Sequence, residues 1–223
     1  MNRKMIEGFV FDFDGLILDT EMPQFNCWKE IFQKYGSTYT IRDWWKTFDT
    51  ATSGYSPAED LYQRMNGKVD RGLVNQWVDQ KTSEILKKQP LLPGVEPFIR
   101  SAHEQGIKLA VATSSSPEWA MPFLEKFDLV QFFDVVLTSR DVQKVKPDPT
   151  LYQLAIEKLG LAPDSAMAFE DSFNGLQSAK SAGIYCTVVA NQITREMDFR
   201  RADKIVASFD QISVEEMRHF AFI

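Results

Sequence analysis

The stretch FVFDFDG at residues 9–15 decides the fold of this chain, because it joins a short β-prone apolar run to two aspartates and a glycine. An apolar run without polar alternation is typical of a strand that is buried on both faces of a parallel sheet. Similar runs recur at residues 108–113, 135–138, 166–169 and 185–189, and a weaker one lies at 204–206. The sequence therefore predicts a parallel sheet whose first strand leads into the aspartates.

Helix-like stretches alternate with these runs. They cover residues 95–105, 117–127, 149–159 and 174–182. A glycine follows three of the four, as expected at a helix C-terminus. This alternation predicts an α/β fold with a doubly wound, Rossmann-like parallel sheet. Ligands of such sheets bind beyond the carboxyl ends of the strands, so the chemistry is expected there.

Residues 20–91 differ from the rest, because they contain no strand-like run. Apolar side chains recur there at helical spacing, beginning with Phe25 and Trp28. We expect an all-helical unit that is inserted after the first strand. The predicted division is a core of residues 1–19 and 92–223 and an inserted helical domain of residues 20–91.

The composition narrows the class of protein. The 223 residues are 44% hydrophobic and carry a net charge of −6 with no basic stripe, which argues against nucleic-acid binding. Two cysteines, and no apolar signal-peptide core at residues 1–9, predict a cytoplasmic protein. No window approaches the roughly 20 apolar residues that span a bilayer, so we expect no membrane partner. No coiled-coil seam or long edge strand is present, and we expect a monomer.

Asp12 and Asp14 are the first candidates for catalysis. Two aspartates at i and i+2 beyond a strand end can share one polar pocket if the chain turns there, and Gly15 permits that turn. One carboxylate can attack phosphorus and form an aspartyl phosphate. The second can give a proton to the leaving oxygen and later take one from water. An Asp-x-Asp sequence by itself is equally compatible with acidic decoration of a loop.

Polar residues follow the other predicted strands as well. Thr113 and Ser114 precede the helix at 117–127, where hydroxyl and N–H groups can hold an anion. Lys146 lies in a Lys-Pro-Asp-Pro segment whose prolines stiffen the backbone. Taken alone, the first pair is also compatible with a helix cap, and Lys146 with a solvated surface charge.

Glu170 and Asp171 follow the run at 166–169. If they face Asp12 and Asp14 at one edge of the sheet, the crowded negative charge is costly unless a cation neutralises it. All-oxygen ligation suits Mg²⁺. The sequence therefore predicts a Mg²⁺ cofactor at this edge.

These four motifs, in this order and at predicted strand ends, resemble the haloacid dehalogenase superfamily. Within it they resemble the subgroup with a helical cap after the first motif, which includes proteins of the beta-phosphoglucomutase and phosphoglycolate phosphatase types. The resemblance runs from Phe9 to about Asp203. It implies a Rossmann-like catalytic core and, at residues 20–91, a helical cap that closes over the site.

The resemblance also implies a role for each matched residue. Asp12 is the expected nucleophile, and Asp14 the expected general acid and base. Thr113 and the Ser114 N–H would hold the transferring phosphoryl group, and Lys146 would neutralise its charge. The implied Mg²⁺ ligands are Asp12, Asp14 through its carbonyl, Asp171, and Glu170 either directly or through a water.

Within this family, the second aspartate and the acidic pair favour phosphate esters over haloacids. Sugar phosphomutases of the group carry a cap His, a cap Ser-Arg pair and a Lys that closes the second motif, whereas Gln24, Ser56-Pro57 and Ser116 stand in the corresponding places here. We therefore expect a phosphatase that acts on a small phosphorylated metabolite, such as a sugar phosphate, through an aspartyl phosphate. The alternatives are a sugar phosphomutase and a non-catalytic binding protein on the same scaffold.

The cap offers five candidate substrate contacts. Glu21 and Gln24 lie near its start, Ser53 and Gly54 lie in a loop, and Lys81 lies in a helical stretch. Gly54 permits close approach of a ligand to the backbone. Each of the five is also compatible with a purely structural role.

Overall fold

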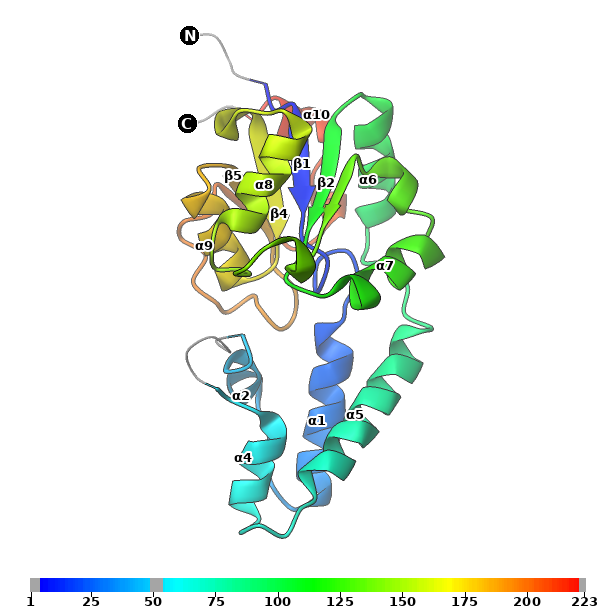
Figure 1. Ribbon diagram of the computed structural model, residues 1–223, viewed down its shortest axis with the longest axis vertical. Coiled ribbons are helices and arrows are strands. Elements are labelled where there is room, and N and C mark those ends of the chain that lie inside the picture. Colours follow the sequence, from blue (N-terminus) through cyan, green and yellow to red (C-terminus); the bar gives the residue numbers. More distant parts are fainter. Residues whose placement is uncertain (1–4, 49–53, 221–223) are drawn as a thin grey trace. The chain divides into compact units, whose positions relative to one another are not determined.

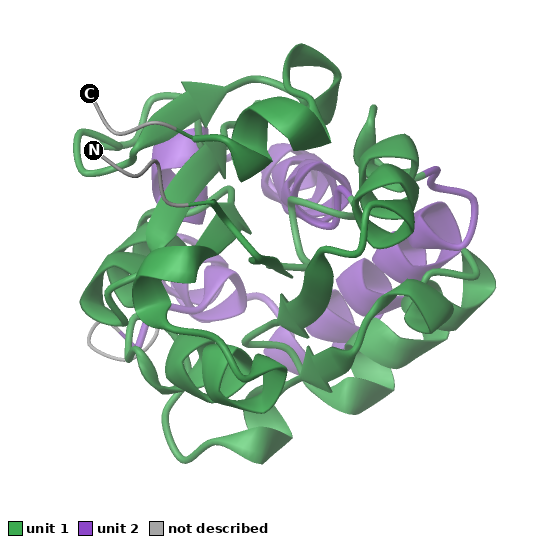
Figure 2. Ribbon diagram, turned by 90° about the horizontal axis from the view of Figure 1, so that it is seen from above, with its two compact units in different colours: residues 1–18, 91–223 green, residues 19–90 purple. Residues whose placement is uncertain are grey.

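The computed structural model describes residues 5–48 and 54–220. The chain divides into two compact units, Met1–Leu18 with Leu91–Ile223, and Asp19–Pro90. Figure 2 colours the two units separately. We call them the sheet unit and the helical unit, and describe each by itself.

The sheet unit is built on parallel strands in the order β3-β2-β1-β4-β5-β6. The strands are β1 (Gly8–Phe11), β2 (Lys108–Ala112), β3 (Val135–Leu137), β4 (Ala166–Glu170), β5 (Tyr185–Val189) and β6 (Lys204–Val206). This order confirms the doubly wound parallel sheet that the apolar runs predict. β1 ends at Phe11, directly before Asp12, and the chain then turns, with the Phe13 carbonyl accepting the Ile17 N–H at 2.9 Å.

Helices cover both faces of the sheet (Figure 1). They are α6 (Val95–Glu104), α7 (Pro117–Lys126), α8 (Thr150–Leu159), α9 (Phe173–Ser181) and α10 (Val214–Arg218), with short 3-10 turns η1 (Val130–Phe132), η2 (Ser139–Asp141), η3 (Pro163–Ser165) and η4 (Phe209–Gln211). Phe9 and Phe11 belong to the apolar cluster of α6, α7 and α10, whereas Val10 belongs to that of α8 and α9. β1 is therefore buried on both faces, which explains its unbroken apolar sequence.

An aromatic cluster holds the central strands in place. Phe9 and Phe11 of β1, Phe169 of β4, Phe98 and Phe209 form a network of ring contacts, with centroids 5.0 Å apart for Phe98–Phe209 and 5.1 Å apart for Phe11–Phe169. Buried aromatic rings contribute large apolar areas and prefer such tilted or offset contacts. This packing fixes β1 and β4 beside each other, and with them the polar residues at their carboxyl ends.

The strand order reverses at β1. β2 lies on one side of β1 and β4 on the other, so consecutive segments of the chain run outward from it in opposite directions. Such a switch point opens a crevice at the carboxyl edge of a parallel sheet, where ligands of doubly wound folds bind. The residues after β1, β2 and β4 meet at that crevice.

The helical unit consists, in the described residues, of α1 (Glu21–Lys34), α2 (Ile41–Trp45), α4 (Pro57–Arg64) and α5 (Arg71–Leu86). α1 and α5 pack against each other, and Trp28, Phe32 and Val78 are among the buried side chains of this unit. A capping box of Thr40 and Asp43 begins α2. Across the described parts of both units, no helix has the length and apolar character needed to cross a membrane.

Candidate active site

The loop after β1 carries Asp12 to the carboxyl edge of the sheet. The Asp12 N–H donates to the Phe169 carbonyl at 3.0 Å, so pairing with β4 continues up to this residue. Only 8% of Asp12 is exposed. Gly15 then turns the chain with a φ of 73°, and its N–H donates to the Leu18 carbonyl at 2.8 Å. Asp12 is therefore a buried carboxylate on a backbone that is fixed on both sides.

Lys146 reaches the same edge from the segment before α8. Its ammonium nitrogen lies 2.7 Å from Asp12 Oδ1 and 2.5 Å from Glu170 Oε1, and its side chain is 5% exposed. The sequence separation between Lys146 and Asp12 is 134 residues. One buried cation thus serves two buried carboxylates.

Glu170, the last residue of β4, is completely buried. Its Oε1 accepts the Tyr152 hydroxyl as well as Lys146. Its Oε2 accepts the Asp171 N–H and the Ser172 hydroxyl, both at 3.2 Å. A Cβ on Gly175 would lie only 1.9–2.0 Å from the carboxyl atoms of Glu170, so glycine is required there. Hydrogen bonds to both carboxylate oxygens and the close approach of Gly175 therefore fix the orientation of the Glu170 side chain.

Asp12, Glu170 and Asp171 form a compact acidic cluster. One carboxylate oxygen of each lies within 4.8 Å of the others, and all three residues are buried. The single Lys146 ammonium does not balance three carboxylates, and crowded carboxylates are stabilised by a cation. An all-oxygen donor set is the one that Mg²⁺ prefers. The chemistry of the cluster therefore fits this metal.

Asp14 directs its carboxylate to other partners. Its Oδ2 accepts the Ser115 hydroxyl at 2.5 Å, and its Oδ1 accepts the indole N–H of Trp119 in α7 at 2.8 Å. The side chain of Asp14 is thus held by the segment after β2, while Asp12 faces Lys146. The two aspartates of the motif have different surroundings, as two different chemical roles require.

Burial dominates the protonation of the cluster. Burial and the charge of Glu170 raise the pKa of Asp12 to about 7, although the Lys146 ammonium opposes this shift. Burial by itself would lower the pKa of Lys146, but the carboxylates of Asp12 and Glu170 hold that pKa above its usual value. Burial, and then the charge of Glu170, also raise the pKa of Tyr152 well above its usual value. Lys146 therefore stays a cation and Tyr152 a neutral donor.

Thr113 and Ser114 follow β2, the strand beside β1. The Thr113 N–H donates to the Leu137 carbonyl at 3.0 Å, and the Thr113 hydroxyl accepts the Ser115 N–H at 3.0 Å. Thr113 is buried and Ser114 is exposed. The structure thus places this segment at the sheet edge that carries Asp12.

Two of the five predicted cap contacts, Glu21 and Gln24, line one pocket within the helical unit. The pocket has a volume of about 380 Å³, and its other lining residues are Trp28, Trp44, Thr47, Phe48, Tyr55, Ser56, Pro57, Asn75 and Asp79. Glu21 Oε2 accepts the Trp44 indole N–H at 2.7 Å. Aromatic, hydroxyl, amide and carboxylate groups share the lining, and no Lys, Arg or His is among the residues that line it in the described part of the chain.

Of the other three predicted contacts, Gly54 and Lys81 are not among the residues that line this pocket. Gly54 is exposed, and a Cβ there would meet nothing within 4 Å. Lys81 pairs with Glu30, and its ammonium lies 4.6 Å from the centre of the Trp77 ring. Ser53 lies outside the described residues.

The sequence did not predict the polar contacts of Ser115, Ser172, Trp119 and Tyr152, nor that of Asn191, whose Nδ2 donates to Asp171 Oδ2 at 2.7 Å. Ser115 belongs to the Thr-Ser-Ser-Ser run, and Asn191 follows the end of β5, so the position of polar residues after strands could have identified both. Trp119 and Tyr152 lie in helices, at positions whose apolar spacing indicates core packing. No local signal distinguishes them from core residues.

Comparison with known proteins places this chain in a family. The family model described as haloacid dehalogenase-like hydrolase matches residues 9–189. YhcW of Bacillus subtilis (strain 168), whose name marks it as a candidate phosphatase, is 36% identical over 94% of this chain and 95% of its own. The "Phosphorylated carbohydrates phosphatase" of Thermotoga maritima is 32% identical, over 80% of this chain and 82% of its own.

A solved structure shares the fold over nearly the whole chain. It is CbbY from Rhodobacter sphaeroides in complex with xylulose-(1,5)bisphosphate, with a TM-score of 0.73 and 26% identity, and it covers 96% of this chain and 99% of that one. The family match at residues 9–189 includes all four motifs, those of Asp12 and Lys146 among them. On these grounds the chain belongs to the haloacid dehalogenase-like hydrolase family.

Proposed function

We propose that this chain is a Mg²⁺-dependent phosphatase that transfers the phosphoryl group of a small phosphorylated metabolite to Asp12 and then to water. One observation carries the proposal: three buried carboxylates meet at the carboxyl edge of the sheet, with the Lys146 ammonium on Asp12. The phosphatase names of the relatives support it. A cytoplasmic location and a monomeric state stay predictions from the sequence.

Asp12 and Asp14 divide the two chemical steps between them. First an oxygen of Asp12 attacks phosphorus, the bond from phosphorus to the ester oxygen breaks, and protonated Asp14 gives its proton to that oxygen. Then Asp14, now a carboxylate, takes a proton from water, whose oxygen attacks phosphorus and breaks its bond to Asp12. Phosphate leaves, and both aspartates return to their first state. The contacts of Asp14 with Ser115 and Trp119 support its role as a separately held proton carrier.

The other residues of the site balance charge and hold the phosphoryl group. Lys146 would neutralise negative charge on Asp12 and on the phosphoryl oxygens, and Thr113 and Ser114 would bind those oxygens. Asp12, Glu170, Asp171 and the Asp14 carbonyl would hold Mg²⁺, which when bound supplies further positive charge for the transferring group.

We also propose that residues 20–91 are a cap that selects the substrate. Gln24, Ser56 and Pro57, which stand where phosphomutases of the group carry His and a Ser-Arg pair, line the pocket of the helical unit. A second phosphate is best bound by Arg or Lys, and the described lining contains neither. Amide, hydroxyl and aromatic groups suit a neutral polyhydroxyl group. This favours a sugar or polyol monophosphate over the bisphosphate that a phosphomutase must hold.

The test is Asp12→Asn, with Asp198→Asn as a matched control on an exposed surface loop. We expect Asp12→Asn to abolish hydrolysis of p-nitrophenyl phosphate while its melting temperature shows an intact fold, and Asp198→Asn to keep full activity. Mass spectrometry of acid-quenched wild type should find a phosphoryl group on the peptide that contains Asp12. Undiminished turnover by Asp12→Asn would overturn the proposal.

A substrate panel separates the alternatives. Conversion of beta-glucose 1-phosphate to the 6-phosphate without release of phosphate would instead identify a phosphomutase. Failure to hydrolyse any member of a panel of sugar phosphates, polyol phosphates, nucleotides and short acid phosphates would favour a non-catalytic binding protein.

A further inference from the structure

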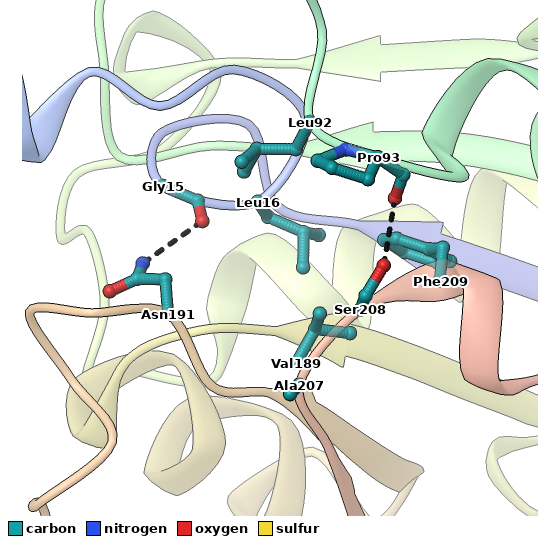
Figure 3. A pocket seen from close by; sticks show the side chains of 9 residues that line it. All are labelled: Gly15, Leu16, Leu92, Pro93, Val189, Asn191, Ala207, Ser208 and Phe209. Atoms are coloured by element: carbon teal, nitrogen blue, oxygen red, sulfur yellow. Dashed lines mark hydrogen bonds between the residues drawn. The ribbon is translucent and has the colours of Figure 1, made fainter.

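Asn191 connects two loops of the candidate metal centre. It lies just beyond the carboxyl end of β5, and its side-chain amide points at the Gly15 carbonyl (Figure 3). Its Nδ2 group donates to the Gly15 oxygen at 3.0 Å and to Asp171 Oδ2 at 2.7 Å. One amide thus binds both the loop that follows Asp12 and Asp14 and the acidic residue after β4.

The orientation of the Asn191 amide follows from its neighbours. Its Oδ1 accepts the backbone N–H groups of Ile193 at 2.8 Å and Thr194 at 3.1 Å. Because backbone N–H groups can only donate, the oxygen must face them and the NH₂ group must face Gly15 and Asp171. Thr194 is fully buried, and its hydroxyl donates to the same oxygen at 3.3 Å. The NH₂ group of Asn191 is therefore oriented toward Gly15 and Asp171 by the protein itself.

Gly15 leaves no space for Asp171 to move toward it. A Cβ at Gly15 would lie 2.2 Å from Asp171 Oδ2 and 3.1 Å from Asn191 Nδ2. The backbone of one loop, the carboxylate of a second and the amide of a third are therefore in close contact. Such contact restricts the Asp171 carboxylate on the side of Gly15, where Asn191 donates a hydrogen bond to its Oδ2.

We propose that Asn191 is a positioning residue that fixes the Asp171 carboxylate for a divalent cation, an inference that rests on the proposed function. A neutral amide suits this role, because it orients the carboxylate and leaves intact the negative charge that attracts the cation. A Lys or Arg would cancel that charge. Groups that orient metal-binding carboxylates in this way typically contribute about 10–100-fold to metal affinity. By its second bond, to Gly15, the same amide keeps the loop of Asp12 aligned with Asp171.

The variant Asn191→Ser tests this role. Its hydroxyl is too short to reach Asp171, but it can still accept the Thr194 N–H and support the turn, more weakly. The matched control is Thr194→Val, which removes the hydroxyl contacts of the same turn and leaves the Asn191 NH₂ group in place. If Asn191→Ser does not fold, Asn191→Thr takes its place, because a β-branched side chain restricts the turn further.

Mg²⁺ binding to the whole protein is measured by isothermal titration calorimetry and by the rise in melting temperature with Mg²⁺. We expect Asn191→Ser to bind Mg²⁺ about 10–100-fold more weakly, and Thr194→Val to bind it like wild type. The kcat of Asn191→Ser for p-nitrophenyl phosphate should return toward that of wild type at high Mg²⁺ concentration, which a general loss of structure would not allow.

The outcomes separate this inference from the proposed function. If wild type binds no Mg²⁺, the proposed function fails and this inference with it. If wild type binds Mg²⁺ and Asn191→Ser binds it equally well, only the role of Asn191 is overturned. Equal losses in Asn191→Ser and Thr194→Val would overturn it as well, because the order of the turn and not the amide would then control affinity.

Discussion

Lys146→Met removes the ammonium that forms ion pairs with both Asp12 and Glu170. The Lys146 side chain is 5% exposed, and its ammonium lies 2.7 Å and 2.5 Å from the two carboxylates, so its loss leaves buried negative charge without its cation. Breaking a buried ion pair in this way costs about 3–5 kcal/mol of unfolding free energy. For a chain of this size each kcal/mol lowers the melting temperature by about 2–4 °C, which gives a loss of about 6–20 °C.

The pH dependence of this loss has a definite sign. The pKa of Asp12 is about 7, because burial and the charge of Glu170 raise it and the Lys146 ammonium opposes part of that rise. Without Lys146 this pKa therefore rises further. A group whose pKa is raised by folding stabilises the folded state at low pH and loses that effect as the pH rises through the folded value. Folded Lys146→Met therefore takes up a proton at higher pH than wild type does. Its defect should be large at about pH 9 and smaller at about pH 6.

The assay is thermal unfolding in EDTA across this pH range, with Lys144→Met as the control, because Lys144 is an exposed lysine of the same segment. Added Mg²⁺ should raise the melting temperature of Lys146→Met more than that of wild type, since it supplies charge that the variant lacks. A melting temperature equal to that of Lys144→Met, or a defect that grows as the pH falls, would refute the reasoning.

Three further predictions concern other contacts. Gly175→Ala should lower the urea midpoint and the free energy of unfolding by about 1–3 kcal/mol, because the new Cβ would lie 1.9 Å from the Glu170 carboxylate. Alanine usually stabilises a helix relative to glycine, so a gain in stability would contradict this clash. Trp119→Phe removes the indole N–H that donates to Asp14 at 2.8 Å. It should slow hydrolysis of phenyl phosphate about 10-fold more than that of p-nitrophenyl phosphate, because the p-nitrophenolate leaving group needs no proton. Equal losses would rule out a role of Trp119 in positioning Asp14 as the proton donor. Burial opposes ionisation of Asp43, yet hydrogen bonds from Lys46 and Thr40 lower its pKa to about 2. Asp43→Asn should therefore lower the free energy of unfolding by about 1–2 kcal/mol at neutral pH. Chemical unfolding at decreasing pH should show the difference from wild type disappear between about pH 4 and pH 2.

Lys146 and Asn191 show how one sheet edge gathers residues from distant parts of the chain. Lys146 comes from the segment before α8 and Asn191 from the loop after β5. Lys146 contacts the carboxylates of Asp12 and Glu170, and Asn191 contacts that of Asp171, just after β4. Neither residue is near its partners in the sequence. What they share is a position at the carboxyl ends of parallel strands, where the switch at β1 opens space for a ligand.

The sequence by itself determined the elements of the sheet unit and the identity of its main acidic residues. A strand buried on both faces must be apolar throughout, so the run before Asp12 predicts a parallel strand. A helix that covers such a sheet must repeat apolar residues every three or four positions. Both rules act over a few residues, and a single sequence therefore reveals them. The same rules predict that polar residues after the strands, such as Asp12 and Glu170, face one edge.

Only the tertiary structure decided which side chains touch at that edge. The bonds of Asp14 to Trp119, of Glu170 to Tyr152 and of Asp171 to Asn191 join segments that the sheet order brings together. Trp119 and Tyr152 have the spacing of core residues, and their polar atoms become contacts only because α7 and α8 begin at the edge where β1 and β4 end. Hydrogen bonds extend about 3 Å, so the partner of a side chain depends on strand order and helix placement, which local sequence patterns do not contain.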